Sequence, residues 1–155
     1  IEDITLEQID DMVNLNMIAP LLLTQAVLPA MRANRYGRIV NIGSRAALGK
    51  SGRTIYGGTK AGLVGMTRTW ALETASQGIT VNLVAPGPIE TELFTASNPP
   101  DLPQTIKIRE SIPVQRFGTP EEIAHAVAMF VDKRAGFITG QVLFVCGGMS
   151  VGLTG

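Results

Sequence analysis

Three side chains in a short part of this sequence have the types and spacing needed to move a proton at a carbonyl or carbinol oxygen. Tyr56 and Lys60 stand four residues apart in the segment YGGTK, so on a helix they share one face, one turn apart. A phenol has a reference pKa of about 10, and one cation about 4 Å away contributes about 4 kcal/mol at an effective dielectric of 20. Lys60 could therefore make Tyr56 a usable acid or base, although such a pair taken alone is more often two solvated neighbours. Ser44, twelve residues before Tyr56, could hold a substrate oxygen beside the phenol.

Asn16 is a fourth polar candidate, and a proline draws attention to it. Asn16 lies four residues before Pro20, which bends a helix because it has no backbone N–H. The Asn16 side chain could therefore meet a backbone carbonyl or a water molecule at the bend.

Helices and strands that alternate along the chain must position these residues. Capping signals and helical periodicity predict three main helices, over residues 6–32 (bent near Pro20), 54–77 (ended by Gly78) and from Thr119 onward. Runs of β-branched residues predict three strands, over residues 38–42, 79–84 and 141–145. Residues 92–112 contain three prolines and no clear period, so we expect a loop that acts as a lid or binding segment.

This alternation predicts an α/β fold, a Rossmann-like doubly wound parallel sheet with helices on both faces. Such sheets bind ligands at the carboxyl ends of their strands. Ser44 follows the first expected strand and the turn 85–88 follows the second. We therefore expect the chemistry at this edge of the sheet.

Composition excludes several classes of function. Thirteen basic residues balance thirteen acidic ones, so nothing favours binding to nucleic acid or to an anionic membrane surface. The most apolar stretch, residues 17–31, is broken by prolines and polar residues, and we expect it to be too short to span a bilayer. Cys146 is the only cysteine, which excludes an internal disulfide and favours a reducing, cytoplasmic location. His125 has no partner at metal-ligand spacing, so no metal site is expected.

Six segments, in this order, resemble the short-chain dehydrogenase/reductase family: NLNMIAPLLLTQAVLPAM, GRIVNIGS, YGGTK, NLVAPGPIETEL, PVQRFGTPEEIA and ITGQVLFVCGG. They cover essentially the whole chain, and their overall pattern is closest to 3-oxoacyl-[acyl-carrier-protein] reductase-like members. The resemblance implies an oxidoreductase that passes a hydride between NAD or NADP and an alcohol or ketone, including a 3-oxoacyl thioester. It does not say which cofactor or which substrate.

The resemblance also implies roles for residues that match the family's motifs. Tyr56 is similar to the catalytic acid/base, and Lys60 to the residue that lowers its pKa and holds the nicotinamide ribose. Ser44 is similar to the group that binds the reacting oxygen. Asn16 is similar to the proton-relay asparagine, with Asn14 as a neighbouring alternative. Four residues resemble the stretch of the family that contacts the nicotinamide: Pro86, Gly87, Ile89 and Thr91. Thr91 and the Ile89 backbone are the candidates for binding the carboxamide.

The sequence departs from the family pattern in three places. It has no Gly-rich phosphate loop and no Asn-Asn-Ala-Gly stretch, and it opens with an acidic segment without an initiator Met. We therefore expect residues 1–155 to be the catalytic C-terminal part of a single domain, and the alternative is a non-catalytic interaction or structural fragment unable to bind cofactor alone. Gly43 stands where many members have a first Ser, and Cys146 where the family often has Asp.

Two further features concern partners. Gly58, Gly62 and Gly65 form one stripe on the second helix, roughly opposite Tyr56 and Lys60. Each costs about 1 kcal/mol relative to Ala, so close packing must compensate, either under the domain's own first helix or, as the resemblance implies, between subunits of a homodimer or homotetramer. A separate cationic group could meet a carrier protein or phosphopantetheine, or be simply solvated: Lys107, Arg109 and Arg116.

Overall fold

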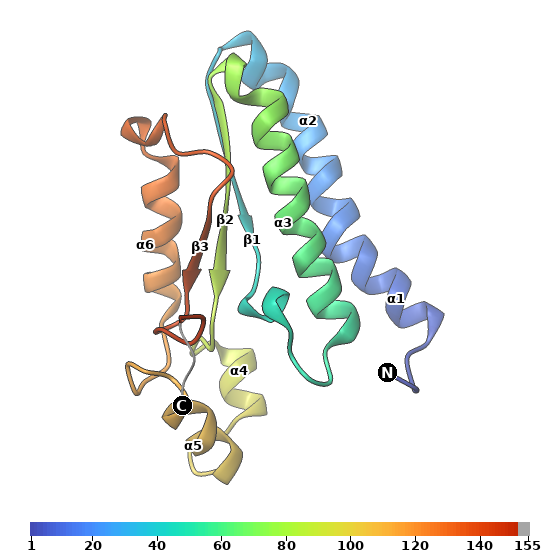
Figure 1. Ribbon diagram of the computed structural model, residues 1–155, viewed down its shortest axis with the longest axis vertical. Helices are drawn as coiled ribbons and strands as arrows, with labels where there is room; N and C mark the ends of the chain where they lie inside the picture. The colour runs from blue at the N-terminus through green and yellow to red at the C-terminus, as the bar shows by residue number, and fades with distance from the viewer. Residues whose placement is uncertain (152–155) are drawn as a thin grey trace.

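A three-stranded parallel sheet forms the centre of the molecule, with helices on both faces (Figure 1). The computed structural model describes residues 1–151. Its strands lie side by side in sequence order: β1 (Gly37–Ile42), β2 (Ile79–Pro86) and β3 (Val142–Val145). This arrangement confirms the α/β class predicted from the alternating elements.

One helical run along the outside of the sheet joins three pieces: α1 (Leu6–Val13), a π-helical turn (Asn14–Ile18) and α2 (Ala19–Ala33). The Thr5–Gln8 capping box opens it as predicted. The π-helical turn lies just before Pro20, where Ala19 donates its backbone N–H to the Asn14 carbonyl, five residues earlier. The predicted disturbance near Pro20 therefore takes the form of a widened turn inside a continuous helical run.

This run is longer than the apolar stretch 17–31 considered from sequence. Residues 6–33 are helical and contain an 18-residue window with a mean hydropathy of 1.4, so by length and composition alone the run could cross a membrane. A core helix of a soluble protein passes the same test, and only 11% of the most apolar window is buried in the structure. The candidate span is therefore the whole run 6–33 and not the stretch 17–31, and the absence of a membrane partner stays a prediction.

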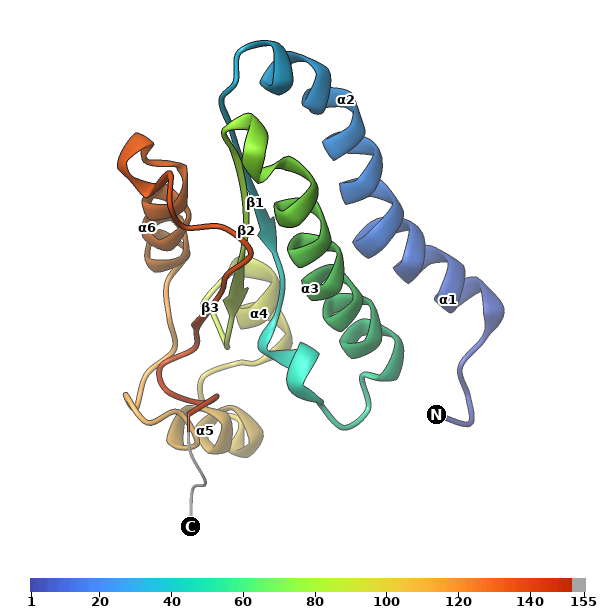
Figure 2. The same cartoon turned by 45° about the horizontal axis from the view of Figure 1, so that its top comes forward.

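The second main helix, α3 (Thr54–Thr74), packs against β2 and lies beside this helical run (Figure 2). It ends in a 3-10 turn at Gly78, whose φ of 77° favours glycine, so the predicted stop is confirmed. α3 packs Leu63 and Trp70 against β2 residues such as Leu83 and Val81. β2 is buried along nearly its whole length and runs two residues past its predicted end at Val84. Two of its buried residues, Thr80 and Asn82, are polar, and the Asn82 amide donates to the Ile138 carbonyl at 2.8 Å and accepts from the Gln141 N–H at 3.0 Å.

Residues 92–112 form two short helices, contrary to the predicted loop. These are α4 (Glu92–Ser97) and α5 (Pro103–Glu110), beyond the carboxyl ends of the strands. Pro99 and Pro100 fall between them, and Pro103 occupies the first turn of α5, where a missing N–H costs nothing. Helices this short do not produce a detectable hydrophobic period.

The opposite face of the sheet is covered by α6 (Pro120–Val131). Thr119 and Glu122 form the predicted capping box, and Glu122 also pairs with Arg116 at 2.6 Å. The hydrogen bonds from Arg116 and from the Thr119 backbone lower the pKa of Glu122 to about 2. α6 then packs Phe130 against Val84 in β2.

Candidate active site

One cavity at the carboxyl ends of β1 and β2 has a volume of about 860 Å³. The structure brings six of the eight predicted site residues to its wall: Ser44, Tyr56, Pro86, Gly87, Ile89 and Thr91. Side chains from α4 and α5 also line it, so residues 92–112 do contribute to the site even though they are helical. The two remaining predicted residues lie outside this wall: Lys60 in α3 and Asn16 in the π-helical turn.

Ser44 is held at the end of β1 by its own backbone turn. It has extended dihedral angles (φ −162°, ψ 149°) and caps a 3-10 helix (Arg45–Leu48), with its Oγ accepting from the Ala46 N–H at 3.1 Å. The hydroxyl proton remains available for a substrate oxygen. Gly57, next to Tyr56, lies close to this turn, because a Cβ there would be 3.0 Å from the Ala46 carbonyl oxygen. The absent side chain lets the first turn of α3 approach the Ser44 turn.

Lys60 lies beside Tyr56 and is anchored to the sheet. Its Nζ donates to the Ile42 carbonyl at 2.9 Å, at the end of β1, and is 5.8 Å from the centroid of the Tyr56 ring. An ammonium group has three donors, so two remain for other partners. Burial lowers the pKa of Lys60 below its usual value, because desolvation disfavours the charged amine.

Asn16 is buried, whereas its neighbour Asn14 is exposed. Its Nδ2 donates to Thr59 Oγ1 at 3.1 Å, and Thr59 donates to the Tyr56 carbonyl at 3.0 Å. The structure thus gives Asn16 a side-chain partner, and a backbone carbonyl or a water as a further partner stays a prediction. The hydroxyl of Thr59 connects the π-helical turn to the turn of α3 that carries Tyr56. Sequence reasoning missed Thr59, although its place in YGGTK, three residues after Tyr56, gave a signal.

The segment after β2 lines the cavity and contains hydrogen-bond donors. Ile89 forms a parallel bridge with Gly118, in which Gly118 donates to Pro88 and Glu90 donates to Gly118. In such a bridge the N–H of the central residue points away from the partner. The Thr91 hydroxyl accepts from the Phe94 N–H at 3.1 Å and retains its own proton. This donor set, with the free donors of Lys60, fits a carboxamide and a ribose hydroxyl.

Gly43 and Cys146 also have structural explanations. A Cβ on Gly43 would lie 2.5 Å from Leu83, so this position at the end of β1 accepts no side chain without movement of the core. Cys146 is buried, with its Sγ 3.2 Å from Ser150 Oγ. A Cβ on Gly87 would lie 2.8 Å from the Cys146 Cα, so these two segments are in close contact.

Asn16 and Lys60 line a second groove of about 450 Å³, which runs between α2 and β1. Within the described residues β1 pairs only with β2, so its other edge has no strand partner. Ile42, at the end of this strand, is 45% exposed. The predicted site residues therefore line two hollows: Ser44 and Tyr56 line the 860 Å³ cavity, and Asn16 and Lys60 line this groove.

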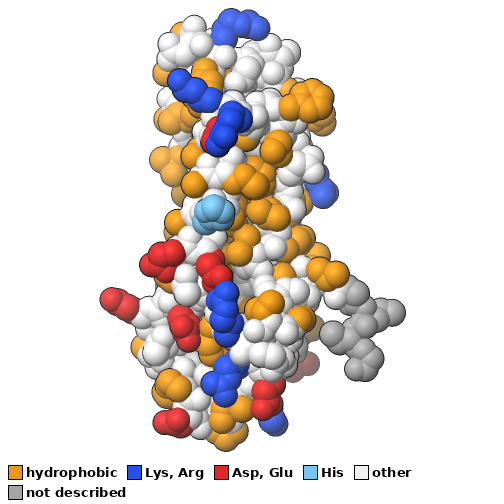
Figure 3. Space-filling model, turned by 90° about the vertical axis from the view of Figure 1, so that its left-hand side faces the viewer, with side chains coloured by type: hydrophobic (Ala, Val, Ile, Leu, Met, Phe, Trp, Pro, Cys, Tyr) orange, Lys and Arg blue, Asp and Glu red, His pale blue; other side chains and the backbone are white. Residues whose placement is uncertain are grey.

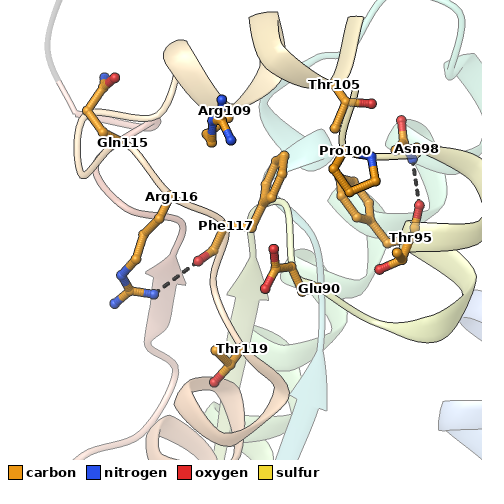
Figure 4. A pocket seen from close by; sticks show the side chains of 11 residues that line it. Glu90, Thr95, Asn98, Pro100, Thr105, Arg109, Gln115, Arg116, Phe117 and Thr119 are labelled. Atoms are coloured by element: carbon orange, nitrogen blue, oxygen red, sulfur yellow. Dashed lines mark hydrogen bonds between the residues drawn. The ribbon is translucent and has the colours of Figure 1, made fainter. Parts of the chain in front are cut away.

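A third cavity, of about 470 Å³, lies on the other side of α4 (Figure 4). Arg109 and Arg116 line it, and Lys107 is exposed outside it. Arg116 donates to the Phe117 carbonyl at 3.0 Å and pairs with Glu122, so it has structural partners. The Phe117 ring packs edge-on against Phe94 at a centroid distance of 5.0 Å.

The remaining candidates have no catalytic surroundings. His125 is exposed on α6, and Figure 3 shows the single histidine on this face of the molecule. Residues 1–151 contain no group of three His, Cys, Asp or Glu side chains that could hold a metal ion.

The glycine stripe of α3 does not behave as one surface. A Cβ on Gly62 would lie 2.9 Å from Met17 Cε of the same chain. A Cβ on Gly58 or Gly65 would meet nothing within 4 Å. Gly62 therefore serves packing inside this chain, and only Gly58 and Gly65 remain candidates for a subunit contact.

Comparisons with known proteins identify the family. The family model described as Enoyl-(Acyl carrier protein) reductase matches residues 1–150. (2S)-[(R)-hydroxy(phenyl)methyl]succinyl-CoA dehydrogenase subunit BbsD of Thauera aromatica is 46% identical over 142 residues, which are 92% of this chain and 56% of that protein. The 3-oxoacyl-[acyl-carrier-protein] reductase FabG of Rickettsia bellii is 42% identical over 144 residues, which are 92% of this chain and 58% of that protein.

A solved structure has the same fold. The blue fluorescent protein from a metagenomic library, crystallised in complex with NADPH, is 33% identical with a TM-score of 0.87, and the match covers 97% of this chain and 60% of that one. The chain thus spans between 56% and 60% of the length of these three proteins. The matched model, the level of identity and the shared fold agree with the six motifs and the cavity they surround. The chain belongs to the short-chain dehydrogenase/reductase family.

Proposed function

We propose that this chain forms the catalytic side of an NAD(P)-dependent oxidoreductase that interconverts an alcohol and a ketone. One observation carries the proposal: the Ser44 hydroxyl and the Tyr56 phenol line one cavity, while Lys60 lies beside the Tyr56 ring, anchored to the end of β1. A reacting oxygen placed between the two hydroxyl groups has a hydrogen-bond donor and a proton source.

The nicotinamide cofactor, NAD or NADP, supplies or accepts the hydride when bound. The free donors of Lys60 would hold its ribose, and the Ile89 N–H and the Thr91 hydroxyl would hold its carboxamide. These contacts would orient the cofactor relative to the substrate, and orientation of this kind can contribute about 7–11 kcal/mol to lowering a barrier.

The proton steps belong to the chain itself. In reduction, Tyr56 donates its phenolic proton to the substrate oxygen while the carbon gains the hydride, and Tyr56 is reprotonated from solvent. In oxidation the proton moves the opposite way. Ser44 donates a hydrogen bond to the same oxygen, the Lys60 ammonium stabilises the phenolate, and Asn16 acts through Thr59 on the turn that carries Tyr56.

The relatives' names support a carbonyl or carbinol substrate, including one attached as a thioester. One relative is a dehydrogenase of a hydroxy(phenyl)methyl-succinyl-CoA, and another is a reductase of 3-oxoacyl groups on acyl carrier protein. For this chain we propose an alcohol/ketone pair or an acyl thioester. We also propose that it acts in the cytoplasm as a homodimer or homotetramer, with no nucleic-acid or membrane partner.

The test of the proposal uses a graft in which this chain replaces the matching part of the R. bellii reductase, which supplies the rest of the family fold. The graft should reduce a ketone with NADH or NADPH. Tyr56→Phe should lower kcat by about 10²–10⁴ with little change in cofactor affinity, because general acid catalysis contributes that much. Tyr36→Phe, which changes the only other tyrosine of the chain, is the matched control. If Tyr56→Phe keeps more than about a tenth of kcat, the proposal fails.

A second candidate is an interaction or structural piece without catalysis. The unpaired edge of β1 and the groove beside it favour this reading, because such an edge is a template for another strand. The sequence also has no Gly-rich turn to hold a pyrophosphate. Titration of the isolated chain with NADH and NADPH separates the two candidates, and micromolar binding would exclude the second.

A further inference from the structure

The wall of the 860 Å³ cavity is strongly cationic on one side. Arg45, Lys50 and Arg53 line it together with Ser44 and Tyr56. We infer that the substrate carries an anionic group, a carboxylate or a phosphate, away from its reacting oxygen, and that these three side chains bind it. The inference rests on the proposed function and narrows its substrate class.

The three cations lie on the segment that joins the two reactive hydroxyl groups. Arg45 directly follows Ser44, and Arg53 precedes Tyr56 by three residues, at the N-cap of α3. Two glycines with positive φ, Gly49 (107°) and Gly52 (71°), turn the segment on either side of Lys50. An anion bound here would therefore belong to the molecule whose oxygen meets Ser44 and Tyr56.

No carboxylate of the described chain neutralises these cations. Among residues 1–151 the ion pairs are Arg116–Glu122 and Arg134–Asp132, and the three cavity cations have no side-chain hydrogen bond. The lining of the cavity includes no Asp or Glu. The chain as a whole is neutral, so this is a local concentration of positive charge. The cavity behind α4 differs, because Glu90 lines it together with its arginines.

The facing wall is mainly apolar. It is formed by Phe94 from α4, Ile108 from α5, Ile123 from α6 and Met149 after β3. Low-dielectric walls strengthen the field of nearby charges, because they exclude water that would screen it. The cavity therefore fits an amphiphilic molecule whose carbon chain lies along the apolar wall and whose anionic end reaches the cations.

Binding to the full chain tests the inference without requiring turnover. The probes are 5-oxohexanoate, its methyl ester as the neutral match, and 4-oxopentyl phosphate, followed by amide chemical shifts in NMR. We expect the better anion to bind at least about tenfold more tightly than the ester, with shifts at Ser44 and Tyr56. Tighter binding of the carboxylate indicates a substrate acid, and tighter binding of the phosphate indicates a phosphorylated carrier.

Charge-neutralising variants test whether these three side chains, rather than a nonspecific attraction to the protein surface, bind the anion. The triple variant Arg45→Gln, Lys50→Gln, Arg53→Gln should remove the preference for the anion, with the dispersion of the spectrum unchanged. Arg68→Gln removes an exposed cation of α3 outside the cavity and should keep the preference. A preference that survives the triple variant, or an ester that binds as well as the acid, would overturn the inference.

Kinetics of the graft distinguish this inference from the proposed function. We expect kcat/KM for 5-oxohexanoate to exceed that for the methyl ester by about tenfold or more, and the triple variant to remove the difference. Equal rates for acid and ester would overturn the inference and leave the proposed function intact. Selective binding of the acid that the triple variant removes, without reduction of either ketone by the graft, would sustain an anion site at these three cations and overturn the proposed function.

Discussion

At the scale of single residues, the site depends on how Lys60 is held. Its amine is half-buried and donates to the carboxyl-end carbonyl of β1, which keeps a positive charge near the Tyr56 ring. Burial lowers the pKa of this amine, so holding its charge at this position costs the folded chain stability. Such a cost is typical of functional positions.

This cost predicts how stability changes with pH. Because the pKa of Lys60 is below 10.5 in the folded chain, the unfolded chain holds the proton to higher pH. The Lys60 contribution to the unfolding free energy therefore rises with pH between the lowered pKa and 10.5. Urea unfolding at pH 7 and pH 10 should show a smaller rise for Lys60→Met than for the wild type. Lys133→Met, at an exposed lysine, should keep the wild-type rise, and an unchanged rise in Lys60→Met would contradict this account.

Residue types and spacing were enough to select Ser44, Tyr56 and Lys60 as site candidates, because the three lie within seventeen positions of one another in the sequence. The contact of Asn16 with Thr59 could not be predicted in the same way, since it joins residues 43 positions apart. The cations at Arg45, Lys50 and Arg53 were also missed, because their common position on a cavity wall exists only after β1 and α3 are packed.

At the scale of elements, the start of α6 shows how a local motif fixes a helix. Thr119 caps the helix, Glu122 closes the capping box, and Arg116 holds the Glu122 carboxylate. These hydrogen bonds lower the pKa of Glu122 to about 2, so the folded chain favours the ionised form.

The stability from Glu122 should be present above its ordinary pKa of 4.5 and disappear as pH falls toward 2. Glu122→Gln should therefore lower the melting temperature at pH 7 and approach the wild type near pH 2. Glu73→Gln changes an exposed carboxylate of α3 and should have little effect at either pH. A deficit in Glu122→Gln that is the same at both pH values would show that the carboxylate charge is not responsible.

Capping signals of this kind made the long helices predictable. The short helices α4 and α5 escaped prediction because prolines in and beside them resemble loop signals and neither is long enough for a period. The end of β2 was placed two residues early, since Pro86 at the last position of a strand resembles a turn residue.

At the scale of the whole molecule, the exposed glycines of α3 mark a surface where another subunit could pack. Gly58 and Gly65 meet nothing within 4 Å, whereas Gly62 packs against Met17. A glycine inside a helix lowers helix stability by about 1 kcal/mol relative to Ala. Close packing of a neighbouring subunit against Gly58 and Gly65 would compensate for this loss.

The double variant Gly58→Leu, Gly65→Leu should shift the protein to smaller species in light scattering, because the larger side chains would block close approach of another subunit. Gly62→Leu is the matched comparison: it should lower the melting temperature through its contact with Met17. An unchanged mass in the double variant would exclude this face as the subunit contact.

Transfer of an isotopic label tests the central claim most directly. The graft is incubated with a ketone and NADPH or NADH that carries deuterium at both C4 positions of the nicotinamide, and the alcohol is examined by mass spectrometry. We predict one deuterium at the carbinol carbon, none at exchangeable positions, and loss of nearly all labelled product in Tyr56→Phe. Unlabelled alcohol, or labelled alcohol formed equally fast by Tyr56→Phe, would contradict the account.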